Sequence, residues 1–194
     1  MSSDSTATRP EVSQLEAELK HEQHKRKYNS TLRSTVGILL VVAAAAVLLA
    51  TIFFPVLRIY GTSMKPTVND GEVVIAFNSR DFKSGSVVAL WYGNKLLVKR
   101  VIATPGQWVN IDKEGNVYVD GQLLDEPYVT ERAFGDCNIE LPCQVPDGHY
   151  FVLGDRRSVS QDSRNTAVGC IAKEQIVGRL LLRVWPVKTT GGIR

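Results

Sequence analysis

Residues 36–57 form the stretch VGILLVVAAAAVLLATIFFPVL, which contains no charged side chain. As an α-helix its 22 residues would span ~33 Å, close to the hydrocarbon core of a bilayer. Helices buried in soluble proteins seldom stay apolar on every side for so long. The stretch begins late and exceeds the hydrophobic region of a cleaved signal peptide. We therefore expect a transmembrane helix over 36–57.

The basic residues that flank this span are unequally distributed. The 15 residues before it contain four basic residues and the 15 after it contain two: Lys25, Arg26, Lys27 and Arg33 before, Arg58 and Lys65 after. Cytoplasmic flanks carry the excess of Lys and Arg. The bias predicts a cytoplasmic N-terminal segment (1–35), the transmembrane helix (36–57) and an extracytoplasmic domain (58–194).

The extracytoplasmic part alternates between short β-rich runs and turn residues. Asp120-Gly121 predicts a two-residue hairpin turn, and Gly93-Asn94 and Gly115-Asn116 mark further turns. No long amphipathic helix follows a strand, so a parallel α/β sheet is disfavoured. We expect a mainly β fold, an antiparallel β domain on one N-terminal membrane helix. Its strands are expected at 72–77, 86–92, 96–103, 107–111, 116–119, 148–153 and 176–185.

Composition excludes some classes of function. The formal net charge is +3 and the basic residues are scattered, which disfavours a nucleic-acid partner. The three cysteines form no CxxC pair and adjoin no histidine cluster, so no metal site is expected. Cys137 and Cys143 lie in a loop-like stretch and could form a disulfide outside the cytoplasm. Cys170 has the apolar neighbours of a small core residue.

A serine protease can activate its nucleophile in two ways that this sequence allows. A Ser-His-Asp triad would have to use His149, and the stretch GTSMK (61–65) departs from GxSxG. A neutral lysine can also be the base if burial lowers its pKa. Lys99 is the best candidate, because it lies in the apolar run LLVKRVIA, whereas the neighbouring Arg100 stays protonated. Both faces of that run are apolar, so a buried base and an edge lysine that reaches water remain equally open.

Three stretches resemble the sequence boxes of bacterial type I signal peptidases. GTSMKPT (61–67) resembles their Ser-Met-x-Pro-Thr box, and KRVIATPG (99–106) resembles their lysine box. GDRRSVSQDSR (154–164) is similar to their late Gly-Asp-Asn-x-x-x-Ser-x-Asp-Ser-Arg box. The boxes follow a membrane helix in the family's order, and the resemblance covers about residues 59–186.

The resemblance implies a membrane-bound serine endopeptidase of the plasma membrane. It would cleave signal peptides from secretory preproteins after small residues, at sites of the Ala-x-Ala type, and would need no cofactor. Ser63 would be the nucleophile and Lys99 the general base, with the Ser63 N–H in the oxyanion hole. Ser160 would hold Lys99 in place.

The resemblance also implies supporting roles for Asp155, Asp162 and Arg164, with Arg100 as a partner for an acid. Surface ion pairs are the plain alternative for these residues. The sequence departs from the family at Gly61, where many members carry a serine that completes the oxyanion hole. It departs again in the late box, where Arg156 replaces asparagine and Ser158 and Val159 replace residues that are often polar or acidic.

The family is thought to bind the cleavage segment as an added β-strand. The matching stretches are 57–62 and 96–98, which makes the expected substrate-binding residues Ile59, Tyr60, Thr62, Leu96, Leu97 and Val98. Exposed apolar residues around Ile59, Tyr60, Trp91 and Trp108 are further expected to dip into the lipid bilayer.

Three alternatives remain, and the three boxes argue against the first of them, a generic anchored β domain with no peptide role. A self-cleaving Ser/Lys protease of the SOS-repressor kind has a similar fold but acts in the cytoplasm, which the membrane helix argues against. A catalytically silent relative would bind exported chains without cutting them, and the presence of both Ser63 and Lys99 argues against it.

Overall fold

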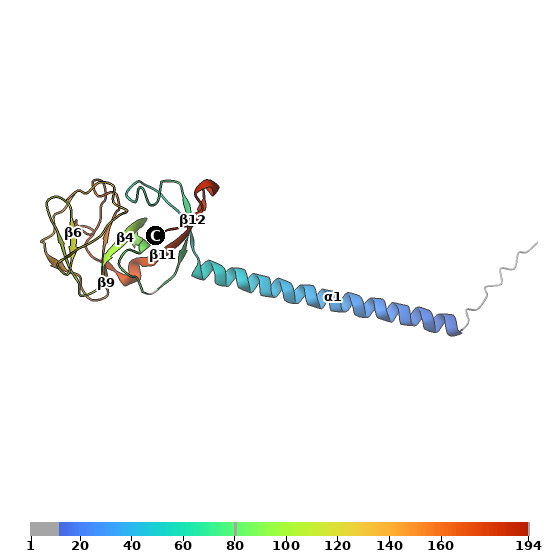
Figure 1. Cartoon of the computed structure of the whole chain (residues 1–194). Coiled ribbons are helices and arrows are strands. Elements are labelled where there is room, and N and C mark those ends of the chain that lie inside the picture. Colours follow the sequence, from blue (N-terminus) through green and yellow to red (C-terminus); the bar gives the residue numbers. More distant parts are fainter. Residues whose placement is uncertain (1–11, 80, 194) are drawn as a thin grey trace, which may run out of the picture. The chain divides into compact units, whose positions relative to one another are not determined.

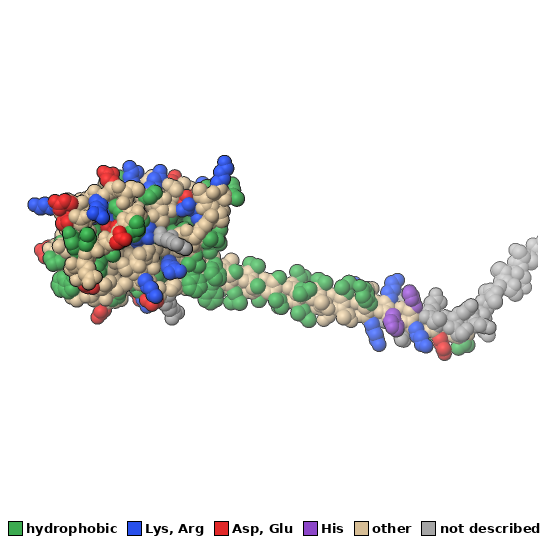
Figure 2. All heavy atoms as spheres, in the orientation of Figure 1, with side chains coloured by type: hydrophobic (Ala, Val, Ile, Leu, Met, Phe, Trp, Pro, Cys, Tyr) green, Lys and Arg blue, Asp and Glu red, His purple; other side chains and the backbone are tan. Residues whose placement is uncertain are grey.

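Figure 1 shows the computed structural model, which describes residues 12–79 and 81–193. The chain divides into two units, residues 1–49 and 50–194. The described residues of the first unit belong to one long helix, α1 (Val12–Phe53). Within this helix, Leu19–Phe53 has the length and composition to cross a membrane, and an 18-residue window of it has a mean hydropathy of 2.9. Hydrophobic side chains cover its later part, whereas Lys, Arg and His gather nearer the N-terminus (Figure 2).

The helix differs from the expected 36–57 at both ends. It continues back through the charged residues to Val12, so much of the expected N-terminal segment is helical, while residues 1–11 of that segment lie outside the described residues. It ends at Phe53 because Pro55 lacks an N–H and disfavours a helical conformation at Phe54. Val56–Arg58 then forms strand β1, which pairs with β2.

The second unit is built from antiparallel strands, as expected. The strand pairs of the described residues are all antiparallel and form two sheets, with orders β1-β2-β11-β3-β4-β9-β10 (β12 also pairs with β11) and β7-β6-β5-β8. In Figure 1, β6 lies at one end of this unit, and β11 and β12 lie at the other. The strands are β1 (Val56–Arg58), β2 (Val73–Phe77), β3 (Val87–Tyr92), β4 (Lys95–Ala103), β5 (Trp108–Ile111), β6 (Val117–Val119), β7 (Gln122–Leu123), β8 (Cys143–Gln144), β9 (His149–Leu153), β10 (Ile171–Ala172), β11 (Ile176–Trp185) and β12 (Gly191–Gly192), with 3-10 turns at Lys173–Gln175 and Val187–Thr189.

The seven predicted strands are present, each within one residue of its expected bounds. The predicted hairpin turn joins β6 to β7, with φ of 51° at Asp120 and 77° at Gly121. The strands that the sequence analysis missed have only two or three residues, too few to show a hydrophobic period.

Strand β4 is the element that brings the site together. It pairs with β3 along Lys95–Arg100, and with β9 only from Arg100 onward. Its apolar side chains enter three core clusters: Val98 packs with Ile59 and Met64, Val101 with Val88, and Ile102 with Phe151. Because the core holds β4 on all sides, the polar residues in its middle have a fixed place inside the domain.

Candidate active site

Ser63 lies on a tight loop between β1 and β2. The buried side chains of Met64 and Val68 fasten this loop to the core, and the Val68 N–H donates to the Met64 carbonyl at 3.0 Å. Arg183 of β11 donates from Nη2 to the Thr67 carbonyl at 2.5 Å. The loop therefore presents the half-buried Ser63 from a rigid base.

Lys99 of β4 lies opposite Ser63. Its side chain is 3 % exposed, and its Nζ lies 3.1 Å from Ser63 Oγ and 2.8 Å from Ser160 Oγ. Burial lowers the pKa of Lys99 to about 8, helped by the charge of Arg164 and opposed by the charges of Asp162 and Asp155. Lys99 is thus a buried amine and does not reach to water, which settles the alternative that its strand pattern left open.

Ser160 owes its position to a close approach of Gly154. A Cβ built on Gly154 would lie 2.2 Å from Ser160 Oγ and 2.7 Å from the Ser63 carbonyl oxygen. The Ser63 carbonyl also accepts a hydrogen bond from the Arg156 N–H at 2.9 Å. The late box therefore touches both the serine loop and the hydroxyl that contacts Lys99.

Ion pairs surround this centre, and they are buried. Arg100 binds Asp155 through Nε at 2.9 Å and Nη2 at 2.8 Å, and Arg164 binds Asp162 through Nε at 2.8 Å. All four side chains are at most 2 % exposed, so the plain alternative of surface pairs is wrong. Asp155 also accepts from Thr67 Oγ1 at 2.5 Å, which ties this network to the serine loop.

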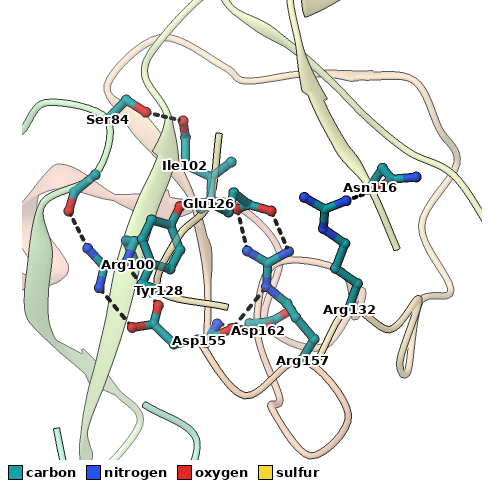
Figure 3. Close-up of polar contacts among 12 residues, drawn as sticks. Ser84, Arg100, Ile102, Asn116, Glu126, Tyr128, Arg132, Asp155, Arg157 and Asp162 are labelled. Carbon is teal, nitrogen blue, oxygen red and sulfur yellow. Dashed lines mark hydrogen bonds and ion pairs between the residues drawn. The ribbon is translucent and has the colours of Figure 1, made fainter. Parts of the chain in front are cut away.

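A third buried pair joins Arg157 to Glu126, a residue outside the three boxes (Figure 3). Tyr128 connects it to the first pair, because its ring lies 3.8 Å from the Arg100 guanidinium carbon and its hydroxyl donates to Glu126 at 3.1 Å. Arg157 Nε donates to the Gly154 carbonyl at 3.1 Å.

A model of the family described as "Signal peptidase, peptidase S26" matches residues 32–185, most of the chain. The chain belongs to this signal peptidase family.

Curated relatives carry matching names. Signal peptidase I of Bacillus licheniformis is 35% identical over 81% of this chain and 90% of its own length. Signal peptidase IB of Staphylococcus aureus is 40% identical over 66% of this chain and 76% of its own length. A solved signal peptidase I from Enterococcus faecalis is 25% identical, with a TM-score of 0.44 over 52% of this chain and 97% of that one. The chain is thus a peptidase of the signal peptidase I kind.

The expected substrate-binding stretches of this signal peptidase border unpaired strand edges. Strand β1 ends its sheet, and the Leu96–Val98 part of β4 pairs with β3 alone among the described strands. Tyr60 and Thr62 are exposed, while Leu96 and Val98 are half-buried against the core. Leu97 packs into a different cluster, so its backbone alone faces the edge.

The four apolar residues that were expected to dip into lipid differ in their exposure. Ile59 is 4 % exposed and packs in the core, so the prediction that it dips into lipid is wrong. Its backbone continues the ladder with β2, through Ile59 N–H to the Glu72 carbonyl at 2.8 Å, so its side chain shares the core-facing side with Leu57, two residues earlier. Tyr60, Trp91 and Trp108 are exposed, and their insertion into lipid stays a prediction.

The remaining candidates take part in none of the hydrogen bonds described for Ser63. His149 Nδ1 lies 2.9 Å from the Asp147 carbonyl oxygen, in a pocket that Cys143 and Cys170 also line, so the triad has no support. Cys137, Cys143 and Cys170 are free thiols here, and the Cys137–Cys143 disulfide stays a prediction. In residues 12–79 and 81–193 no three His, Cys, Asp or Glu side chains gather as metal ligands.

Sequence reasoning missed Tyr128 and Glu126, the partner of Arg157. Glu126 and Tyr128 lie in an irregular segment between β7 and β8. Such a segment has no hydrophobic period that would signal burial, and Arg157 lies 31 residues away along the chain. The one local signal was that Glu126 is an acid directly before Pro127 and the aromatic Tyr128.

Proposed function

We propose that this chain is a membrane-bound serine endopeptidase that cleaves N-terminal signal peptides from exported preproteins after small residues. Ser63 is the nucleophile and Lys99 the general base. The observation that carries the proposal is the buried Lys99 amine, 3.1 Å from Ser63 Oγ and 2.8 Å from Ser160 Oγ. A lysine with a pKa of about 8 is neutral often enough near physiological pH to accept a proton.

In the first step Ser63 Oγ attacks the scissile carbonyl carbon while its proton passes to Lys99. The neutral amine has one lone pair and two N–H bonds, so it accepts from Ser63 while it donates to Ser160 Oγ. The ammonium then protonates the departing amine of the mature protein, which leaves the signal peptide esterified to Ser63. In the second step Lys99 takes a proton from water, the water oxygen attacks the ester, and the proton returns to Ser63.

The negative charge on the tetrahedral oxygen needs donors. The Ser63 N–H donates to no other described residue, so it is available to this oxygen. The Gly61 N–H donates to Asp70 Oδ1 at 2.8 Å and Gly61 has no hydroxyl, which removes it as a second donor. We assign the second donor to water or to another backbone N–H.

The cleavage segment is proposed to bind as an added strand between β1 and the first half of β4. Ile59 is already paired with Glu72, so the alternating pattern of a strand turns the Tyr60 N–H and carbonyl outward. Neither group bonds to another described residue. Leu96 and Val98 offer the opposite edge, and shallow contacts there suit the small side chains of an Ala-x-Ala site.

The proposed setting is the plasma membrane, with α1 as a single-pass anchor, a cytoplasmic N-terminus and an extracytoplasmic β unit. Lys and Arg before the span support this orientation. Ser63 follows the end of α1 at Phe53 by only ten residues, which suits cleavage sites close to the bilayer surface.

The test is cleavage of a preprotein with an Ala-x-Ala site by the full chain in liposomes. Wild type is expected to cut after the second alanine, and Ser63→Ala and Lys99→Met are expected to be folded and inactive. Binding without cutting by wild type would instead indicate a silent relative. Cutting by Ser63→Ala would refute the proposed nucleophile.

A further inference from the structure

Glu126 is a buried acid close to the proposed site, and no catalytic step uses it. Its side chain is 1 % exposed, and both of its oxygens are bound by Arg157, with Nη1 at 3.1 Å from Oε2 and Nη2 in short contact with Oε1. A two-point contact of this kind fixes the orientation of the guanidinium as well as its position. Glu126 therefore determines where Arg157 lies.

Arg157 in turn fixes the backbone at the start of the late box (154–164). Its Nε donates to the Gly154 carbonyl at 3.1 Å, and the Gly154 N–H donates to Asp162 Oδ2 at 3.1 Å. Both polar groups of the Gly154 backbone are thus held. Gly154 lies against Ser160 Oγ without room for a methyl group. A shift of Gly154 would therefore displace Ser160 from its contact with Lys99.

Tyr128 adds a second branch from Glu126 (Figure 3). Its hydroxyl donates to Glu126 Oε1 at 3.1 Å, and its ring lies over the guanidinium of Arg100, which pairs with Asp155. Burial raises the pKa of Tyr128, so the phenol keeps its proton and remains a donor. Glu126 thereby links the ion pair of Arg157, which binds the Gly154 carbonyl, to that of Arg100, which binds the adjacent Asp155.

We propose that Glu126 is a positioning residue of this peptidase, which through Arg157 and Gly154 keeps Ser160 Oγ against Lys99 Nζ. It acts through other residues and touches neither the substrate nor the reacting atoms. The inference rests on the proposed roles of Ser63 and Lys99.

The test compares Glu126→Gln with Val117→Ala in the full chain, by steady-state cleavage of a preprotein. The first variant keeps the side-chain size but removes the charge that holds Arg157. The second shortens a fully buried side chain on β6 that makes none of these polar contacts, so it is a control for lost stability. At a temperature where both are folded by circular dichroism, Glu126→Gln is expected to lower kcat by about tenfold with little change in KM. Val117→Ala is expected to keep the wild-type kcat.

The pH profile separates positioning from stability. In Glu126→Gln the freed Ser160 admits water to Lys99, which raises the pKa of the amine. The pH at which kcat/KM rises should therefore increase above the wild-type value of about 8. A purely structural role would leave that pH unchanged. Tyr128→Phe removes one hydroxyl and keeps the ring on Arg100. If Glu126→Gln fails to fold, Tyr128→Phe is measured in its place, and its kcat is expected to fall by about threefold.

Equal losses of kcat in Glu126→Gln and Val117→Ala, or an unshifted pH profile, would overturn the positioning role. Failure of the proposed function has a different signature. Wild type and Ser63→Ala would then be indistinguishable in the same assay, and the inference would fall with it.

Discussion

The substitution Gly154→Ala should damage the site without touching a catalytic side chain. The new Cβ would lie 2.2 Å from Ser160 Oγ and 2.7 Å from the Ser63 carbonyl oxygen, where ordinary contacts begin at 3.4 Å. Ser160 must therefore retreat by an ångström or so from the place where it contacts Lys99, and the Ser63 loop is pushed as well. A misplacement of about 1 Å can reduce catalysis by about 100-fold, and we expect a loss of that order in kcat.

The assay is kcat for preprotein cleavage, measured with the melting temperature of each variant. Gly191→Ala is the matched control, since a Cβ at Gly191 in β12 meets nothing within 4 Å. Overpacking of this size costs about 1–3 kcal/mol of stability, so Gly154→Ala should still fold. A folded Gly154→Ala protein with the activity of Gly191→Ala would refute the close packing of Gly154 against Ser160 and Ser63.

Three further outcomes are expected. The kcat/KM for cleavage should rise as pH is raised through about 8, because the neutral form of Lys99 is the base, and a flat profile would contradict this. The free energy of unfolding, measured with urea, should rise between about pH 8 and 10.5, since the unfolded chain keeps the lysine proton to higher pH. Asp155→Asn should lower that free energy by about 3–5 kcal/mol at neutral pH, because Arg100 then stays buried without its charged partner. A loss below 1 kcal/mol in the same urea titration would show that this pair is dispensable.

The sequence predicted the strands well for a physical reason. Runs such as 96–103 and 176–185 are long enough for their β-branched and apolar content to stand out, and Asp120-Gly121 suits a turn with positive φ. The end of the helix was misjudged because hydrophobicity alone set its limit. Pro55 carried the better signal, since it stops a helix even inside an apolar run.

The candidate site was predictable in its chemistry and less so in its surroundings. Lys99 stood out as a candidate base because it lies in an apolar run, whereas Ser63 was named through the resemblance of residues 61–67 to the family's serine box. The burial of Asp155 and Glu126 was not, because their partners lie 55 and 31 residues away along the chain. Local patterns carry no information on such pairs, so an acid in a polar loop looks the same whether it faces water or a buried arginine.

The most direct test of Ser63 as the nucleophile is to trap the covalent intermediate. Wild-type protein is mixed with a preprotein, quenched in acid within milliseconds and digested, and the fragment that contains Ser63 is weighed by mass spectrometry. This fragment is expected to gain the mass of the signal-peptide acyl group in wild type and never to gain it in Lys99→Met. Acylation of a different residue, or steady cleavage by Ser63→Ala with no ester formed, would show that Ser63 is not the nucleophile.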